Sequence, residues 1–250
     1  MNEINIKTWN INWFRGLKSG DKYDSTDQNE DCYKDIIITI KSFLINNNNS
    51  VAILQEVPFK EKNVNGEWDE NIYHKKLIED FPKEEYEIIS NVENNDYVLR
   101  RIIAIYRKND YKKTQIHRLC NNRIIGLSNG SIIIIGVHMP TKFEKESNDE
   151  KMWDDLLTYV RECGKDNKKL ILIGDFNAYV GCNNKLTEEK FIQLSRIMND
   201  IVSDDTHTFI GNTAIDHLFV NYDTHQLYNI KIQNEFKCSD HKYIEVRINY

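Results

Sequence analysis

One short apolar run, Leu170–Ile173, is followed almost at once by a carboxylate and an amide. Its branched residues predict a single strand buried on both faces, and such a strand needs a covering layer on each side. Gly174 ends the run, and Asp175 and Asn177 follow. Because alternate side chains of a strand share a face, we expect these two side chains to point the same way.

A carboxylate and an amide at the end of a buried strand can hold a water molecule, a metal ion or a phosphate. Asp and Asn also favour helix N-caps and turns, so a purely structural role explains them equally well. The stretch alone does not choose between a site and a turn. The residues at the ends of the other strands must decide between a site and a turn.

Composition indicates a globular protein. The chain has 250 residues, of which 40% are hydrophobic and 29% charged, and this length fits one large domain or two small ones. No repeat, low-complexity segment or linker divides it, and candidate site residues lie near both ends, which favours a single catalytic domain over residues 1–250. No apolar run is long enough to span a bilayer, and the N-terminal segment does not resemble a secretory signal.

Five cysteines are scattered along the chain without a C-x-x-C pair. This odd number argues against a disulfide framework and structural zinc, and favours a reducing, cytoplasmic setting. The formal charge of −6 gives no overall attraction to a polyanion. A phosphate-bearing substrate would therefore need a bound cation or a local basic patch. Nothing in the sequence indicates an obligate protein partner.

Hydrophobic periodicity predicts both helices and strands. Helices are expected at 31–45, 72–81, 149–163 and 186–201. Strands are expected at 4–10, 51–57, 86–90, 99–107, 113–119, 123–127, 131–138, 170–173, 214–221, 227–233 and 241–249. The polar stretches 17–30 and 59–71 are expected to be loops. Strands cluster in hairpins with helices between the clusters, which predicts an α/β (α+β) fold of two mixed sheets packed face to face with helices on the outer faces.

Several predicted strands carry polar residues at or near an end. They are Asn10, Asn12, Gln55, Glu56, His138, Asp175, Asn177, Asp216, His217, Asp240 and His241. Each has a structural alternative, such as a turn residue, an exposed strand end or a core histidine. Asp216 is the hardest to explain that way, because an ionised carboxylate within an apolar strand needs a partner. Their joint occurrence at strand ends favours a site.

Six short motifs resemble the endonuclease/exonuclease/phosphatase superfamily, which has the fold of deoxyribonuclease I. They are Thr8-Trp-Asn-Ile-Asn12, Leu54-Gln-Glu-Val57, Gly136-Val-His-Met-Pro140, Gly174-Asp-Phe-Asn177, Ile215-Asp216 and Ser239-Asp-His241. Each is weak alone, but all six occur in family order across nearly the whole chain. The resemblance implies a four-layer sandwich that hydrolyses phosphoesters with Mg²⁺ or Mn²⁺.

The resemblance also implies a role for each matching residue. Glu56 would be the main metal carboxylate, with Asn10 beside it and Asp240 on the metal side of the same cleft. Asp175 would orient and deprotonate the attacking water, and Asn177 would hold that water or a phosphate oxygen.

Two histidines complete the implied set. His241 would bind the scissile phosphate, with Asp216 fixing its tautomer and favouring its charged form, and His138 would donate to another phosphate oxygen. In-line attack needs such a positioned water and charge neutralisation on the phosphoryl oxygens.

The chain departs from one branch of the family at two positions. Abasic-site endonucleases carry an acid where this chain has Asn12, and a tyrosine where it has His138. His138 instead resembles the nuclease, sphingomyelinase, deadenylase and inositol-phosphatase branches. We therefore expect a nuclease other than a typical abasic-site enzyme, with one metal held by Glu56.

Substrate contacts are expected from loops around the cleft. We assign them to Asn12, Trp13, Arg15, Arg101 and Lys142. An aromatic ring beside arginine can stack on a base and grip a phosphate, but Trp13 can equally pack in the core. The leading hypothesis is a nuclease acting on DNA or RNA, and the alternative is a phosphatase or phosphodiesterase for a small or lipid phosphoester, such as an inositol phosphate or sphingomyelin. A non-catalytic binding protein is disfavoured because the candidate residues are complete. We expect His217 to be structural, and His74 and His207 to lie at the surface.

Overall fold

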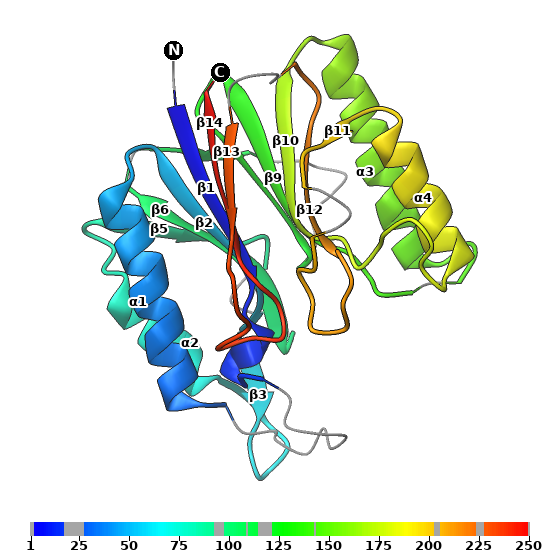
Figure 1. Cartoon of the computed structure of the whole chain (residues 1–250). Coiled ribbons are helices and arrows are strands. Elements are labelled where there is room, and N and C mark those ends of the chain that lie inside the picture. The colour runs from blue at the N-terminus through cyan, green and yellow to red at the C-terminus, as the bar shows by residue number, and fades with distance from the viewer. Residues whose placement is uncertain are drawn as a thin grey trace.

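Two mixed sheets pack face to face, and each carries helices on its outer face (Figure 1). The computed structural model describes residues 3–17, 28–92, 98–108, 110–114, 122–142, 144–202, 206–223 and 228–249. This four-layer arrangement confirms the fold class predicted from the clustering of strands.

The first sheet joins the two ends of the chain. Its strands are, in spatial order, β13 (Tyr228–Ile232), β14 (Ile244–Asn249), β1 (Glu3–Asn10), β2 (Ser50–Pro58), β6 (Arg100–Arg107) and β5 (Tyr86–Ile89). Strand β1 pairs antiparallel with β14 and parallel with β2. The first and last described strands therefore lie side by side in the middle of this sheet.

The second sheet places three candidate site residues in one row. Its strands are, in spatial order, β11 (Asn199–Asp200), β12 (Asp216–Val220), β10 (Lys169–Asp175), β9 (Ile132–His138), β8 (Ile124–Ser128) and β7 (Lys112–Lys113). Asp175 is in register with His138 on one side and with Asp216 on the other. The pairing itself therefore aligns the end of β10 with both neighbours.

The layer between the sheets is built mainly of isoleucine and valine. Its members include Ile4, Ile6, Val51, Ile53, Ile102, Ile134, Ile171, Ile173, Leu218 and Val246. These side chains come from the inner faces of both sheets and interdigitate, as expected for aligned sheet packing. At Gly136 a Cβ atom would lie 2.5 Å from Ile53 Cγ2, so the close approach of β9 to the first sheet requires glycine there.

Helices close the two outer faces. The first sheet is covered by α1 (Glu30–Asn46) and α2 (Ile72–Asp80), and the second by α3 (Asn148–Lys165) and α4 (Lys185–Ser195) (Figure 1). Each is capped by the residue before it, whose side chain accepts a hydrogen bond from a first-turn N–H; these residues are Asn29, Asn71, Ser147 and Asn184. Within the described parts of the chain, no helix combines the length and apolar character needed to cross a membrane.

Three elements differ from the predictions. The polar stretch 59–71 contains a hairpin of β3 (Lys60–Lys62) and β4 (Trp68–Glu70), because the Asn63 side chain accepts backbone N–H groups across the turn. The helix expected to reach residue 201 ends at Ser195, because β11 pairs with β12 instead. Of the strand predicted at 113–119, the structure shows only β7, and residues 115–119 lie outside the described residues.

Candidate active site

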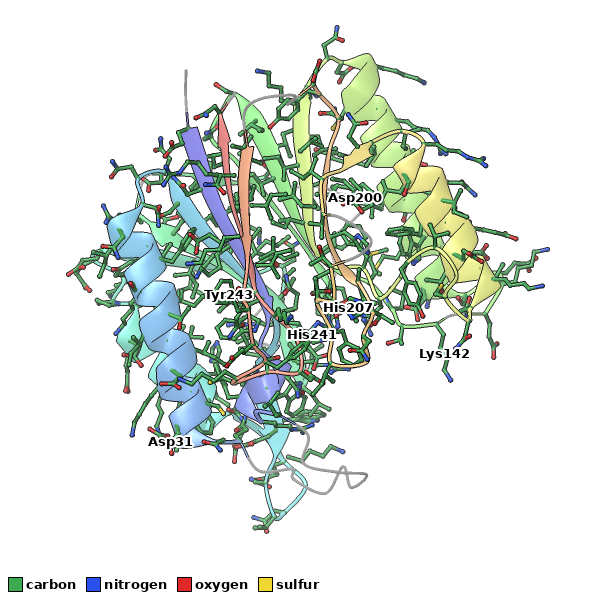
Figure 2. All side chains as sticks on the ribbon, viewed as in Figure 1. Asp31, Lys142, Asp200, His207, His241 and Tyr243 are labelled. Carbon is green, nitrogen blue, oxygen red and sulfur yellow. The ribbon has the colours of Figure 1, made fainter. Side chains whose placement is uncertain are left out.

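One pocket of about 550 Å³ brings most of the predicted site residues together. The predicted residues that line it are Asn10, Asn12, Arg15, Glu56, His138, Lys142, Asp175, Asn177, Asp240 and His241. Asp216 lies directly behind His241, and Trp13 and Arg101 are not among the lining residues. His241 lies near the lower ends of the central strands in the view of Figure 2.

Asp175 lies at the end of β10 and is buried. The Asn10 side-chain amide donates to Oδ2 at 3.0 Å, and the backbone N–H of Asn177 donates to Oδ1 at 2.8 Å. Burial raises the pKa of Asp175; the neighbouring His241 and His138 offset this only in part. A carboxylate with a raised pKa is a better proton acceptor near neutral pH than an exposed one.

The turn after β10 is fixed by Gly174 and Asn177. Gly174 has φ +138°, and a Cβ atom there would lie 2.2 Å from the carbonyl oxygen of Val137. Asn177 has φ +49°, in the left-handed region, and its side-chain amide donates to the carbonyl oxygen of Met139 at 2.9 Å. This turn therefore serves the site, because it locks Asp175 against β9.

His241 forms a pair with Asp216. The distance between His241 Nδ1 and Asp216 Oδ2 is 2.9 Å, and Nε2 lies 4.0 Å from Asp175 Oδ2. Burial alone would lower the pKa of His241, but the carboxylates of Asp216, Asp175 and Asp240 raise it to about 10. The imidazole is therefore protonated at neutral pH and directs a charged N–H toward Asp175.

The loop that carries His241 is anchored to β1. The Ser239 hydroxyl donates to the carbonyl oxygen of Asn10 at 2.6 Å and accepts the backbone N–H of His241 at 3.1 Å. The Trp9 indole N–H donates to the carbonyl oxygen of His241 at 3.0 Å. Two of these bonds join segments more than 200 positions apart, and the bonds of Ser239 explain why serine precedes the Asp240–His241 pair.

Glu56 lies at an irregularity within β2. The register with β6 shifts between Leu54 and Val57, and Glu56 has φ +55°. Its carboxylate contacts Arg100 Nη1 through Oε2 at 2.6 Å and His138 Nε2 through Oε1 at 3.4 Å. Burial would raise the pKa of Glu56, but His138 and Arg100 lower it to about 2. The carboxylate is thus ionised at any neutral pH.

The oxygen atoms beside Glu56 suit a hard divalent cation. Glu56 and Asp240 offer carboxylates and Asn10 an amide oxygen in the same pocket, which are ligand types that Mg²⁺ and Mn²⁺ prefer. Asn10 donates its N–H₂ to Asp175, so its Oδ1 is on the other side, where it accepts the N–H of Asn12 at 3.1 Å. The residues present therefore fit such an ion.

A second group could also hold a metal by distance alone. Asp175, Asp216 and His241 offer ligand atoms within 4.8 Å of one another. The hydrogen bond between His241 and Asp216 already accounts for the closeness of these two residues. Glu56, Asp240 and Asn10 form a separate set of oxygen ligands in the same pocket.

The assignment of Arg101 to the cleft is corrected by the structure. Its side chain is only 7% exposed, contacts His74 Nε2 and lies 4.1 Å over the Phe59 ring. Because side chains alternate along a strand, Arg100 takes the position in the cleft instead. His74, expected at the surface, is buried beside Arg101, whereas His207 is exposed as expected.

The residues after β1 divide between core and cleft. A short 3₁₀ turn, η1 (Asn12–Phe14), follows the strand, and all three of its residues have positive φ. Phe14 is fully buried, in contact with Tyr33. The Arg15 guanidinium lies over the Trp13 ring, 4.5 Å from the ring centroid. Arg15 lines the pocket, and Trp13 supports it from behind.

Several lining residues were missed by sequence reasoning. They include Arg123, Tyr179, Cys182, Asn183, Asn184, Phe209 and Thr213. Arg123 donates to the carbonyl oxygen of His138 at 3.4 Å, and burial lowers its pKa. The hairpin register, which sets Ile124 opposite Val137, could have indicated that Arg123 adjoins His138. The other missed residues lie in loops without a recognisable pattern.

His217 is structural, as expected. Its Nδ1 lies 2.7 Å from Asp200 Oδ2, and its Nε2 lies 3.0 Å and 2.9 Å from the carbonyl oxygens of Ala178 and Ala214. It therefore ties the turn after Asp175 to β12 and β11.

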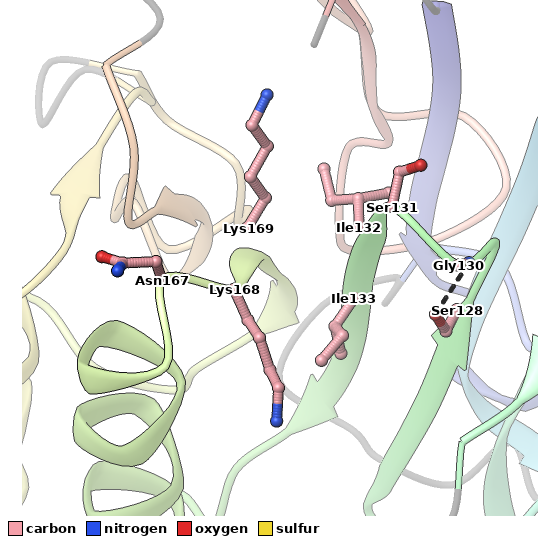
Figure 3. A pocket seen from close by; sticks show the side chains of 8 residues that line it. All are labelled: Ser128, Gly130, Ser131, Ile132, Ile133, Asn167, Lys168 and Lys169. Atoms are coloured by element: carbon pink, nitrogen blue, oxygen red, sulfur yellow. Dashed lines mark hydrogen bonds between the residues drawn. The ribbon is translucent and has the colours of Figure 1, made fainter.

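Another hollow, of about 570 Å³, lies at the opposite ends of β9 and β10 (Figure 3). Its lining contains Lys168, Lys169 and Asn167, and no carboxylate side chain. The two lysines point apart in Figure 3, and Lys168 pairs with Asp166 at 2.9 Å. This hollow therefore lacks the groups that a hydrolytic site needs.

Residues 8–241 match the Endonuclease/Exonuclease/phosphatase family. The chain belongs to this family. Members of the family are hydrolytic nucleases and phosphatases that depend on a divalent metal ion. The match confirms the resemblance seen in the six motifs and spans nearly the whole chain.

Solved structures with the same fold include several enzymes of this family. An AP endonuclease from Archaeoglobus fulgidus is 14% identical with a TM-score of 0.66, covering 99% of this chain and 100% of that one. The endonuclease domain of TRAS1, a telomere-specific non-LTR retrotransposon, is 15% identical with a TM-score of 0.61 and 99% coverage of both. TDP2 from C. elegans is 15% identical with a TM-score of 0.61, covering 99% and 75%. At these identities they establish the deoxyribonuclease I-like fold. No curated protein matches the chain by sequence.

Proposed function

We propose that this chain is a nuclease that hydrolyses phosphodiesters of DNA or RNA by in-line attack of a water molecule. The observation that carries the proposal is the lining of one pocket. Hydrolytic residues from both ends of the chain meet there with four cationic side chains, Arg15, Arg100, Arg123 and Lys142. Several cations around one cleft suit a substrate with phosphates on both sides of the scissile bond.

Asp175 prepares the water in this scheme. Its Oδ atoms are held by Asn10 and by the backbone of Asn177, so the carboxylate cannot rotate away. Its raised pKa favours taking the proton that the water loses as its oxygen bonds to phosphorus. Asn177 lines the same pocket and is placed to position the water or a phosphate oxygen.

His241 and His138 stabilise the charge on the phosphoryl oxygens. Asp216 holds His241 Nδ1 and favours the imidazolium, so Nε2 presents a charged donor to the pocket. His138 Nε2 lies 3.7 Å from Asp175 Oδ2 and faces the same space. Donors fixed before the reaction stabilise developing charge without reorganisation.

A divalent ion, Mg²⁺ or Mn²⁺, held by Glu56, Asn10 and Asp240 would supply Lewis-acid stabilisation of the phosphoryl and leaving oxygens. Glu56 contributes an ionised carboxylate at any working pH, as its low pKa requires. The four cysteines that the structure describes are free thiols: Cys32, Cys163, Cys182 and Cys238. Free thiols are in keeping with the reducing, cytoplasmic setting that we propose.

The alternative substrate is a small phosphoester. An inositol phosphate carries several phosphates and would satisfy the same four cations. A lipid phosphoester such as sphingomyelin offers one phosphate, which uses fewer of them.

A substrate panel separates these possibilities. The purified chain is incubated with Mg²⁺ or Mn²⁺ and plasmid DNA, single-stranded DNA, RNA, inositol phosphates or sphingomyelin, with Asp175→Asn as the inactive control. We expect cleavage of a nucleic acid that the control does not show. Turnover of only inositol phosphate or sphingomyelin would reject the nuclease proposal.

A further inference from the structure

We propose that Arg100 exchanges partners when the metal binds. In the metal-free enzyme its guanidinium neutralises Glu56, and the incoming cation displaces it so that it binds a phosphate of the substrate. This inference rests on the proposed function, because it takes Glu56 as the metal carboxylate. It adds a positioning residue that links metal occupancy to substrate affinity.

The ion pair itself is the first observation. Arg100 Nη1 lies 2.6 Å from Glu56 Oε2, a short charge-assisted contact. The Arg100 side chain is 42% exposed, whereas that of Glu56 is 16% exposed. The arginine therefore reaches in from the rim of the cleft, and the glutamate is embedded in its wall.

The backbone at Arg100 is fixed, whereas its side chain is held, among the described residues, by the contact with Glu56. Arg100 begins β6 and is in register with Pro58, and its carbonyl oxygen accepts the side-chain amide of Asn122 at 3.3 Å. A long side chain on a fixed backbone can swing without disturbing the sheet. Its tip then stays within the pocket that it lines.

Glu56 cannot move in the same way. Its φ of +55° places it at the strand irregularity, and His138 Nε2 lies 3.4 Å from its other oxygen, Oε1. A cation that takes Glu56 as a ligand must therefore come to the carboxylate where it is. At Oε2 that position is filled by the guanidinium.

Electrostatics makes the two occupants mutually exclusive. Two cations on one carboxylate oxygen repel each other strongly inside a partly buried pocket. Once released, the guanidinium regains a partner only from another anion, and its planar donor pair matches a phosphate. Metal binding thus frees a phosphate ligand at the time the substrate is needed.

Two other arginines of the pocket make different contacts. Arg123 donates to the carbonyl oxygen of His138, and Arg15 stacks on Trp13. Among the residues that the structure describes, Arg100 is the arginine or lysine recorded in an ion pair with Glu56. This difference supplies matched controls within the same pocket.

The first test measures metal affinity without turnover. Binding of Mn²⁺ to the metal-free protein is titrated by the electron paramagnetic resonance signal of free Mn²⁺, for wild type and Arg100→Gln. We expect Arg100→Gln to bind Mn²⁺ about three- to tenfold more tightly, because the competitor is gone. Arg107→Gln, at the far end of β6 with the same charge change, should match wild type, and Arg123→Gln should give a smaller increase.

The second test measures the coupling to substrate. A fluorescent oligonucleotide is titrated by anisotropy in an Asp175→Asn background, with Mn²⁺ or with a chelator. We expect Arg100→Gln to weaken oligonucleotide binding about five- to tenfold with Mn²⁺ and less than twofold without it. The reason is that Arg100 is available to a substrate phosphate only when Mn²⁺ has displaced it from Glu56, so metal binding and substrate binding are coupled.

Each outcome has a distinct meaning. Unchanged or weaker Mn²⁺ binding by Arg100→Gln overturns the exchange. Suppose that Arg100→Gln binds Mn²⁺ more tightly but loses the same oligonucleotide affinity in chelator and in Mn²⁺. That result overturns the claim that Arg100, once displaced by the metal, binds a substrate phosphate. If no oligonucleotide binds to the Asp175→Asn protein, with or without Arg100→Gln, the nuclease proposal fails. The Mn²⁺ titration still tests the exchange at Glu56 in that case.

Discussion

At Asp175, the proposed base, an ionised carboxylate lowers the stability of the fold. It is almost fully buried, and burial raises its pKa, so the ionised form is maintained at a cost in solvation. The Asn10 and Asn177 donors compensate for part of that cost. Such a group is expected where chemistry, rather than packing, determines the residue.

Asp175→Asn should therefore separate activity from stability. Turnover on a cleaved substrate should fall by about 10²- to 10⁴-fold, because the amide cannot accept the proton of the water. The thermal midpoint in chelator should stay the same or rise, because a buried charge is removed. Activity assays and a melting curve check both, with the exposed Asp166→Asn as control. Near-normal turnover would show that another group is the base.

His241 gives a prediction for pH. Its pKa is about 10 in the folded protein against an ordinary 6.5, so folding favours the protonated form. The stabilisation is complete below pH 6.5 and is lost as pH rises from 6.5 toward 10. Urea unfolding of wild type and His241→Gln at pH 6 and 9.5, both in chelator, should show the advantage of wild type shrinking at the higher pH. A pH-independent difference would contradict the pairing with Asp216.

Single residues also show where sequence reasoning stops. Most catalytic candidates were identifiable because they end apolar strands, and the structure brings Asn10, Glu56, His138 and His241 into one pocket. Arg100 and Arg101 could not be distinguished in this way. A shift of one residue in register reverses the faces of a strand, and two adjacent arginines carry no pattern that fixes it.

At the scale of elements, the approach of β9 to β10 determines where Asp175 lies. Gly174 is the point of contact, because its missing Cβ leaves room for the carbonyl oxygen of Val137. Any side chain there would separate the strands at the row that joins His138, Asp175 and Asp216. The glycine of the motif is thus a packing requirement with a catalytic consequence.

Gly174→Ala should be far more damaging than Gly130→Ala. Both glycines have positive φ, so both lose about 1 kcal/mol or more through backbone strain, but only Gly174 has an atom within 4 Å of the added methyl group. We expect Gly174→Ala to lower the free energy of unfolding by about 3 kcal/mol or more and to abolish turnover. Urea unfolding checks it; equal losses for the two variants would rule out the clash.

Elements were predictable where local pattern and tertiary structure agree. Apolar runs gave β1, β2, β9, β10 and β12, and periodic spacing gave α1, α2 and α3 close to their observed bounds. The errors fall where pairing overrides local signals. The two strands of the β3–β4 hairpin consist of charged residues apart from Trp68. Strand β11 is two residues long and exists only through its pairing with β12.

At the scale of the whole molecule, the two sheets share one apolar layer. Each sheet buries its inner face only against the other, so neither has a complete core alone. The clustering of strands in the sequence predicted this layering. The order of strands within each sheet was not predictable, because several antiparallel arrangements bury the same apolar faces.

A shared core implies a single cooperative unfolding transition. Trp9 belongs to the core under the helices of the first sheet, and Trp153 to that of the second; both are buried. In variants that keep only one of these tryptophans, with the remaining three replaced by Phe, urea midpoints from the two probes should coincide. Separate midpoints would show that residues 1–250 contain two independent units.

The pairing of β1 with β14 also has a consequence for synthesis. Asn10 leaves the ribosome early, but its partners Ser239 and His241 are added more than 200 residues later. Until then β1 can pair with β2, yet the Ser239–His241 loop that completes the pocket does not exist. A nascent chain is therefore unable to assemble the whole pocket before residue 241 has emerged from the ribosome.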